Sequence, residues 1–163
     1  MHRLLRHLQL LCLAVTVVAF SPLVTAAPKS VPFQATISFL EQLSLPDPAS
    51  PCLFVGQIAG DGNATGLGNL HLSSTDCIVP LATNLFLFSS QQVVLTLAGG
   101  EIWATYGGTL TVDTGLIAGL YFVHGGTGRF VHATGAGTIT GREALDPSTG
   151  GRGEIQLSGT LQY

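Results

Sequence analysis

Glycines within strand-like segments are the feature that most constrains the fold of this chain. The sequence contains 21 glycines, and they follow no period of three, which excludes a collagen-like triple helix. Several lie inside runs that otherwise alternate as strands do, among them Gly107, Gly108, Gly137 and Gly141. Glycine within a strand marks a bulge, a sharp bend or a close approach of two backbones. The pattern therefore predicts a strongly bent β-sheet.

Strand-like runs follow one another along most of the chain, and no segment has a helical period. Turn signals of hairpin size separate them, for example Asp61-Gly62-Asn63, Ser89-Ser90 and Asp113-Thr114-Gly115. We predict strands at Phe33–Leu40, Leu53–Ala59, Ala64–Ser73, Asn84–Phe88, Val93–Ala98, Glu101–Val112, Leu116–Val123, Ala133–Arg142 and Gly153–Tyr163.

An open meander of this kind has two unpaired edge strands, and closure of the sheet removes both. We therefore predict an all-β fold, a small closed antiparallel meander barrel of about eight strands. The glycines inside its strands would supply the sharp coiling that a small barrel requires. A two-sheet sandwich is the alternative.

The N-terminal segment has the features of a signal peptide. Arg3 and Arg6 precede the apolar run Leu10–Phe20, and Val24-Thr25-Ala26 offers small residues for cleavage before Ala27. The alternative is a membrane anchor, but 11 apolar residues are fewer than the roughly 20 that span a bilayer. We predict a signal peptide over 1–26, a single barrel domain over 27–163, and a secreted or periplasmic protein with no transmembrane segment in its mature form.

The charge of the mature chain excludes several partners. Residues 27–163 hold four cationic side chains (Lys29, Arg129, Arg142 and Arg152) against nine acidic ones, a net charge of −5. Nucleic-acid binding needs a basic surface, so no nucleic-acid partner is expected. No polybasic or amphipathic helical segment is present for an anionic membrane.

Cys52 and Cys77 remain after cleavage, and two cysteines in an exported protein most simply form one disulfide. On the chain-entropy model such a bond stabilises the fold by roughly 3–4 kcal/mol. A metal site is the alternative, but the sequence has no C-x-x-C and few histidines near either cysteine.

Two stretches resemble a known group of proteins. The first is Tyr121-Phe-Val-His-Gly-Gly-Thr-Gly-Arg-Phe-Val-His-Ala-Thr-Gly-Ala-Gly-Thr-Ile-Thr-Gly141, and the second is Gly60-Asp-Gly-Asn-Ala-Thr-Gly-Leu-Gly68. The first is similar to the penultimate hairpin of the barrel shared by allene oxide cyclases and dirigent proteins. Both together resemble bacterial exported proteins of unknown function with this barrel. The resemblance covers about Gly56 to Tyr163 and implies the calycin-like barrel predicted above.

The resemblance also implies two kinds of function. Allene oxide cyclases close an epoxide ring without a cofactor in a largely apolar cavity, and dirigent proteins steer radical coupling in a similar one. No polar residue of the cyclases falls on a matching position here. We therefore assign no catalytic residue, and we expect no cofactor and no metal.

The turn at Gly125, Gly126 and Gly128 is the most specific part of the resemblance. We interpret it as a structural corner, in which the three glycines take positive φ and Phe130 plugs one end of the barrel. The alternative is a ligand-gripping or catalytic loop that acts through Arg129 or His124.

Other candidate chemistry is sparse. His124 and His132 could face one another across the hairpin as a metal-binding or pH-sensitive pair, although two surface residues are the plainer interpretation. Glu101 and Asp113 flank a strand and a turn, but nothing pairs them as a glycosidase acid and base. Aromatic residues at strand positions either fill the interior or line a ligand cavity; they are Phe33, Phe39, Phe54, Phe86, Phe88, Trp103, Tyr106 and Phe122.

These observations favour an exported, non-catalytic β-barrel that binds a small apolar ligand or serves a structural role in the envelope. The alternative is a cofactor-free cyclase or isomerase of the allene oxide cyclase type. Two or three polar side chains that converge in a cavity would favour the enzyme.

Overall fold

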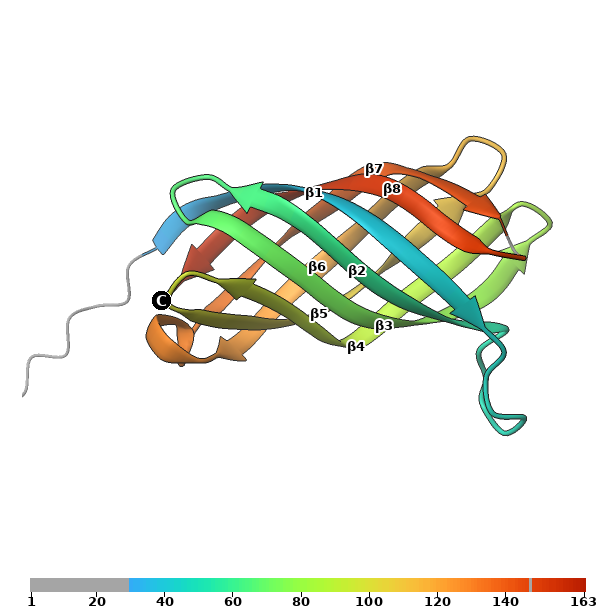
Figure 1. Cartoon of the computed structure of the whole chain (residues 1–163), viewed down its shortest axis with the longest axis horizontal. Helices are drawn as coiled ribbons and strands as arrows, with labels where there is room; N and C mark the ends of the chain where they lie inside the picture. The colour runs from blue at the N-terminus through green and yellow to red at the C-terminus, as the bar shows by residue number, and fades with distance from the viewer. Residues whose placement is uncertain (1–29, 147) are drawn as a thin grey trace, which may run out of the picture.

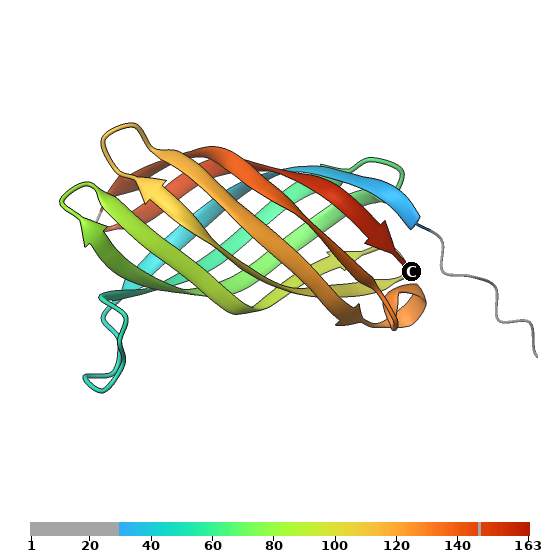
Figure 2. The same ribbon diagram turned by 180° about the vertical axis from the view of Figure 1, so that it is seen from behind.

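The chain folds into a closed antiparallel barrel (Figures 1 and 2), which confirms the predicted all-β barrel over the sandwich. The computed structural model describes residues 30–146 and 148–163, so the predicted signal peptide over 1–26 lies outside the described residues. Eight strands are found within them: β1 (Ser30–Ser44), β2 (Phe54–Ala64), β3 (Gly68–Ala82), β4 (Leu85–Leu97), β5 (Gly100–Thr111), β6 (Leu116–Gly126), β7 (Thr134–Asp146) and β8 (Gly150–Gln162).

Each strand pairs with its neighbours in sequence, and the pairing of β1 with β8 closes the barrel. The first and last strands pair over nearly their whole length, from Ser30 opposite Gln162 to Glu41 opposite Gly151. No edge strand is therefore left unpaired among the described strands. The removal of unpaired edges was the reason to expect a closed barrel. Within the same residues, no helix is long and apolar enough to cross a membrane.

Alternation along the strands separates interior from exterior. In β1, buried and exposed residues alternate from Phe33 to Glu41, as they must in a strand whose one face is covered. The interior is filled largely by aliphatic side chains and a few aromatic ones. Trp103 and Phe122 fall on the outward positions of β5 and β6 and are exposed by 39% and 53%, so these two aromatics do not fill the barrel.

Two of the predicted turns are wrong. Asp61-Gly62-Asn63 continues β2 in register with β1, and the turn lies at 65–67 instead, where the Leu67 N–H donates to the Ala64 carbonyl oxygen at 3.0 Å. A Cβ on Gly62 would lie 2.1 Å from the carbonyl oxygen of Thr36. The glycine thus permits a close approach of β1 and β2 and does not make a turn.

Ser89-Ser90 also lies within a strand, because β4 runs unbroken from Leu85 to Leu97. Its register with β5 shifts between Ser90 and Val93, as at a β-bulge. The two predicted runs on either side of the serines are therefore one strand, and the polar residues between them mark the irregularity.

The barrel has two unlike ends. The disulfide end is formed by the connections 45–53, 83–84 and 112–115 together with residues 148–149, and it lies on the right in Figure 1. A bond between Cys52 and Cys77 ties the first of these connections to β3, with the two Cα atoms 5.2 Å apart. The predicted disulfide is therefore present.

The opposite end holds the short helix η1 (Gly128–Phe130) and the C-terminus. Phe130 is completely buried, and its ring centroid lies 5.1 Å from that of Tyr163. Gly128 has a φ of +58°, but Gly125 and Gly126 do not have positive φ. The expectation for these two glycines is wrong because both belong to β6. At Gly126 the close neighbour is backbone, since a Cβ would lie 2.0 Å from the Glu101 carbonyl oxygen.

Candidate functional site

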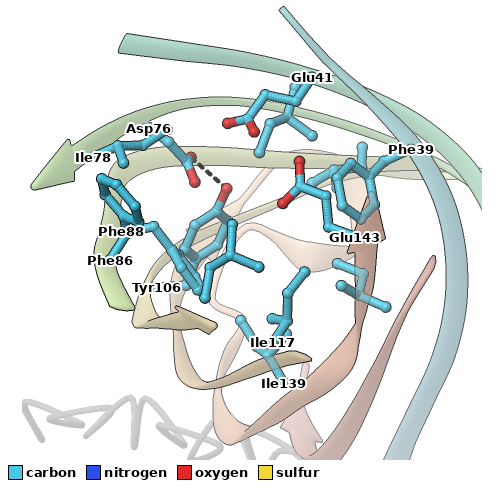
Figure 3. A pocket seen from close by; sticks show the side chains of 14 residues that line it. Phe39, Glu41, Asp76, Ile78, Phe86, Phe88, Tyr106, Ile117, Ile139 and Glu143 are labelled. Carbon is cyan, nitrogen blue, oxygen red and sulfur yellow. Dashed lines mark hydrogen bonds between the residues drawn. The ribbon is translucent and has the colours of Figure 1, made fainter. Parts of the chain in front are cut away.

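The half of the barrel nearer the disulfide end contains a cavity of about 50 Å³. Its wall is mostly apolar and comes from all eight strands: Phe39, Ile58, Leu72, Ile78, Phe86, Phe88, Leu110, Ile117, Ile139 and Ile155 line it, together with Glu41, Asp76, Tyr106 and Glu143. Figure 3 shows this cavity with the polar side chains directed into it. Four polar groups thus converge in an otherwise apolar space, a combination typical of ligand sites.

Three of the four polar groups are carboxyls that occupy ordinary inward positions of their strands. Glu41 continues the inward row of β1, Asp76 that of β3 and Glu143 that of β7. They are exposed by only 5%, 3% and 8%. Acidic side chains are rarely buried to this extent unless a partner compensates them.

Asp76 has partners within the site. Its Oδ1 atom accepts hydrogen bonds from the Tyr106 hydroxyl and, at 2.9 Å, from the Ser74 hydroxyl. The Tyr106 ring in turn meets the Phe88 ring edge to face, with centroids 5.8 Å apart. Asp76 and Tyr106 are therefore held in position by the strands β3, β4 and β5 together.

Glu41 and Glu143 lie on the other wall, with their carboxyls turned toward the same space (Figure 3). Each extends over a glycine of a neighbouring strand. A Cβ on Gly56 would lie 1.9 Å from Glu41 Oε1, and a Cβ on Gly151 would lie 1.8 Å from Glu143 Oε1. Glycine at these two inward positions leaves the room that the carboxyls occupy. Oε1 of Glu143 is buried and has no hydrogen-bond partner among the described residues.

Burial raises the pKa of all three carboxyls. It raises the pKa of Glu41 to about 8, with the neighbouring Glu143 adding to the effect. It raises the pKa of Asp76 to about 7, against the opposing effect of the hydrogen bonds from Tyr106 and Ser74. The pKa of Glu143 is raised as well, mainly by burial. Burial and the nearby Asp76 also hold the pKa of the Tyr106 phenol well above its usual value. Glu41 of the free site is thus mostly protonated near neutral pH, and Asp76 titrates close to it.

No cationic side chain of the described residues compensates these acids inside the barrel. Arg129, Arg142 and Arg152 are all exposed on the outside, as are His71, His124 and His132. Nor do the described residues contain a group of three His, Cys, Asp or Glu that could hold a metal ion. The negative charge of the three carboxyls is therefore neutralised by bound protons or by a bound molecule.

The cavity adjoins a second one, here called the mouth, at the disulfide end. The mouth has a volume of about 230 Å³ and shares Ile78 and Phe86 with the inner cavity. Four of its other lining residues are apolar, namely Leu43, Phe54, Val112 and Leu145, and three are polar, namely Thr83, Asn84 and Asp113. A ligand that entered at this end would pass apolar walls before it met the carboxyls.

A smaller cavity of about 20 Å³ lies deeper in the barrel and shares Leu72, Tyr106, Ile139 and Ile155 with the first. Tyr121 lines it, and its buried hydroxyl lacks a hydrogen-bond partner among the described residues. Beyond it, Phe33, Phe130 and Leu161 are fully buried and fill the opposite end. The interior is therefore hollow toward the disulfide end and filled at the other.

Most of the polar residues and turn glycines singled out from the sequence lie away from the inner cavity, and Asp113 lines the mouth. His124 and His132 are exposed. Glu101 accepts a hydrogen bond from the Trp103 indole at 3.0 Å, and Asp113 accepts one from the Asn84 amide at 2.9 Å. Gly125, Gly126, Gly128 and Phe130 lie at the opposite end; their assignment as a structural corner stays a prediction. Of the predicted aromatics, Phe39, Phe86, Phe88 and Tyr106 line the cavity.

Comparison with known proteins gave matches of shape only. No protein-family model matches the chain, and no curated protein matches its sequence. Among solved structures, the pterocarpan synthase dirigent protein GePTS1 matches with a TM-score of 0.49 and 13% identity, over 92% of this chain and 99% of its own. The pterocarpan synthase dirigent protein PsPTS1 matches with a TM-score of 0.45 and 12% identity, over 84% of this chain and 97% of its own. The place of this chain among the families named above stays a prediction.

Proposed function

We propose that this protein is an exported, non-catalytic β-barrel that binds a small ligand with an apolar body in the cavity at its disulfide end. The observation that carries the proposal is the convergence of buried polar groups in an apolar space that adjoins an apolar mouth. A barrel with a purely structural role gains nothing from buried carboxyls, because an uncharged apolar core is the more stable filling.

Export is part of the proposal. The signal sequence over 1–26 would direct it, and a disulfide forms and persists in oxidising compartments. N-terminal sequencing of the exported protein should give Ala27 as the first residue. A mature protein that began at Met1 would contradict export.

The size of the site limits the ligand. A space of about 50 Å³ is well below the several hundred Å³ of pockets for drug-sized molecules. The inner cavity therefore takes one small polar head, and the mouth takes a ring or a short chain.

Binding is tested with N-phenyl-1-naphthylamine, a neutral apolar probe that fluoresces in apolar surroundings. Ile117→Phe places a larger side chain in the cavity wall, and Ala118→Phe places the same side chain on the outer face of the same strand. We expect Ile117→Phe to weaken binding of the probe and Ala118→Phe to leave it unchanged. Equal affinity in both variants, or no binding by the unmodified protein, would contradict a ligand site in the barrel.

A second candidate function is a cofactor-free cyclase or isomerase. The observation that favours it is the pKa of Asp76, raised by burial to about 7, because a carboxyl that titrates near the working pH is suited to general acid–base catalysis. Native mass spectrometry of the mildly extracted protein would identify a bound molecule. Conversion of that molecule by the protein, lost in Asp76→Asn while binding remains, would favour the enzyme over the binding protein.

A further inference from the structure

We propose that the ligand of this cavity is a small organic monocation, a protonated amine whose ammonium head sits among Glu41, Asp76 and Glu143 while its apolar body lies in the mouth. The inference rests on the proposed function, since it names the class of ligand for the same site.

The first argument is the imbalance of charge-bearing groups around the cavity. Glu41 faces it from β1, Asp76 from β3, Tyr106 from β5 and Glu143 from β7. The other four strands contribute only apolar side chains to the wall, namely Ile58, Phe86, Phe88, Ile117 and Ile155. Since every arginine and histidine of the described residues is exposed, the acids face no cation of the protein. A cationic ligand would supply the missing partner.

The second argument is the unpartnered oxygen of Glu143. Its side chain is exposed by only 8%, and its buried Oε1 has no hydrogen-bond partner among the described residues once the neighbouring Glu41 carboxyl, the group that can donate to Glu143 while protonated, is ionised. A buried acceptor without a donor costs about 1–3 kcal/mol or more, so a ligand that donates there gains affinity. An ammonium group carries three donors and no acceptor. It can therefore satisfy Glu143 and Glu41 together, whereas an alcohol has one donor.

The third argument is the chemistry of the walls. The rings of Phe88 and Tyr106 meet beside the acids, and aromatic faces attract organic cations. A bare metal ion does not fit, because the described residues hold no suitable group of three ligands and Asp76 Oδ1 is already engaged by Tyr106 and Ser74. The apolar mouth matches the body of an arylalkyl or alkyl ammonium ion.

The proposal has a distinctive pH dependence. In the free protein, burial keeps Glu41 mostly protonated and Asp76 partly protonated near neutral pH, with pKa values of about 8 and about 7. Entry of a cation favours the ionised form, so binding should release about one proton. Affinity for an amine should rise by up to about tenfold per pH unit while the carboxyls are protonated in the free state, and level off above about pH 8. A neutral ligand that accepts a hydrogen bond from a protonated carboxyl should show the opposite trend.

Three probes of similar shape but different charge test whether the site prefers a cation: 2-phenylethylamine, 2-phenylethanol and phenylacetate. Calorimetric titration at pH 6, 7 and 8, in two buffers with different ionisation enthalpies, gives the affinity and the number of protons released. We expect the amine to bind more tightly than the alcohol by about tenfold or more at pH 8, a difference of about 1.4 kcal/mol. Phenylacetate should bind least.

Glu41→Gln/Glu143→Gln should remove the preference for the amine and the proton release, while the matched exposed variant Glu154→Gln should keep both. Circular dichroism would establish that each variant is folded. If the double variant does not fold, the single variant Glu143→Gln takes its place in the test. Equal or tighter binding of the alcohol would overturn the cation proposal and leave the proposed function standing. The same conclusion would follow if none of the three probes bound while N-phenyl-1-naphthylamine still did. Failure of all four would overturn both.

Discussion

The carboxyl of Glu143 lies over Gly151, on the neighbouring strand, so closely that a Cβ at Gly151 would come within 1.8 Å of Oε1. The same relation holds between Glu41 and Gly56. A buried acid thus depends on a missing side chain one strand away. These two glycines shape the site, whereas the contacts of Gly126 are with backbone and shape the barrel itself.

Gly151→Ala is the direct test of this relation. We expect the new methyl group to displace the Glu143 carboxyl and to cost less than about 1 kcal/mol of stability, because the atom it meets is the end of a flexible side chain. Gly126→Ala should cost about 3 kcal/mol or more, since backbone must move. Urea denaturation gives both values, and the carboxyl ¹³C shift of Glu143 reports its displacement. A larger loss for Gly151→Ala than for Gly126→Ala would be inconsistent with this division.

Stability should fall as the pH rises from about 5 to about 8. Glu41 and Asp76 have pKa values of about 8 and about 7 in the folded protein, against 4.5 and 3.8 for the free side chains. Between these values the folded state binds more protons than the unfolded state, so each unit of pH removes up to about 1.4 kcal/mol per group. The contribution is fully present near pH 4 and lost once the pH passes the folded-state values.

Urea melts from pH 4.5 to 8.5 measure this dependence. Glu41→Gln should remove the part of it that Glu41 contributes and leave the part due to Asp76, because glutamine has no proton to lose, and the exposed Glu154→Gln should leave it as in the unmodified protein. A stability that increased with pH over this window would mean that the carboxyls are ionised in the folded state.

The sequence predicted the barrel because two independent signals agreed. The alternation of apolar and polar residues with a period of two indicated strands. The glycines within these strands indicated a strongly coiled sheet, as a small closed barrel requires. The strand boundaries were less accurate because short polar stretches such as Asp61-Gly62-Asn63 look like turns. Only the position of Gly62 opposite Ile37 shows that the glycine permits close packing there.

The buried acids escaped prediction for a related reason. The predicted strands stop at Leu40, Ser73 and Arg142, so all three acids fall outside them, whereas the observed strands β1, β3 and β7 continue past Glu41, Asp76 and Glu143. Glu41 nevertheless continues the inward row of Phe33, Ile37 and Phe39 in β1. Extension of each alternation across the acid would have placed all three inside the barrel. Their convergence in one cavity depends on how the three strands β1, β3 and β7 are placed around the closed barrel, and a single sequence does not reveal the register of strand pairs.

Reduction of the Cys52–Cys77 bond should lower stability. The cysteines are 25 residues apart, and the chain-entropy model gives about 3.5 kcal/mol for a loop of that length. We expect Cys52→Ser/Cys77→Ser to lower the free energy of unfolding, measured by urea denaturation, by this amount, and dithiothreitol to lower that of the unmodified protein equally. No change on reduction would indicate that the denatured chain is not restrained by this loop.

The last prediction concerns the plug at the opposite end, where Arg129 and Phe130 are adjacent but differ in burial. Phe130 is fully buried against Tyr163, so Phe130→Ala should cost about 3–5 kcal/mol. Arg129 is exposed, with its guanidinium 4.7 Å from the Phe130 ring centroid, and an exposed cation–π contact contributes only about 0.5–1 kcal/mol. Arg129→Ala should therefore cost far less, and neither variant should alter binding at the disulfide end. A ligand-binding loop predicts the reverse: Arg129→Ala would abolish binding, and Phe130→Ala would cost little stability. Urea melts and probe titrations of the two variants therefore decide between a structural corner and a binding loop.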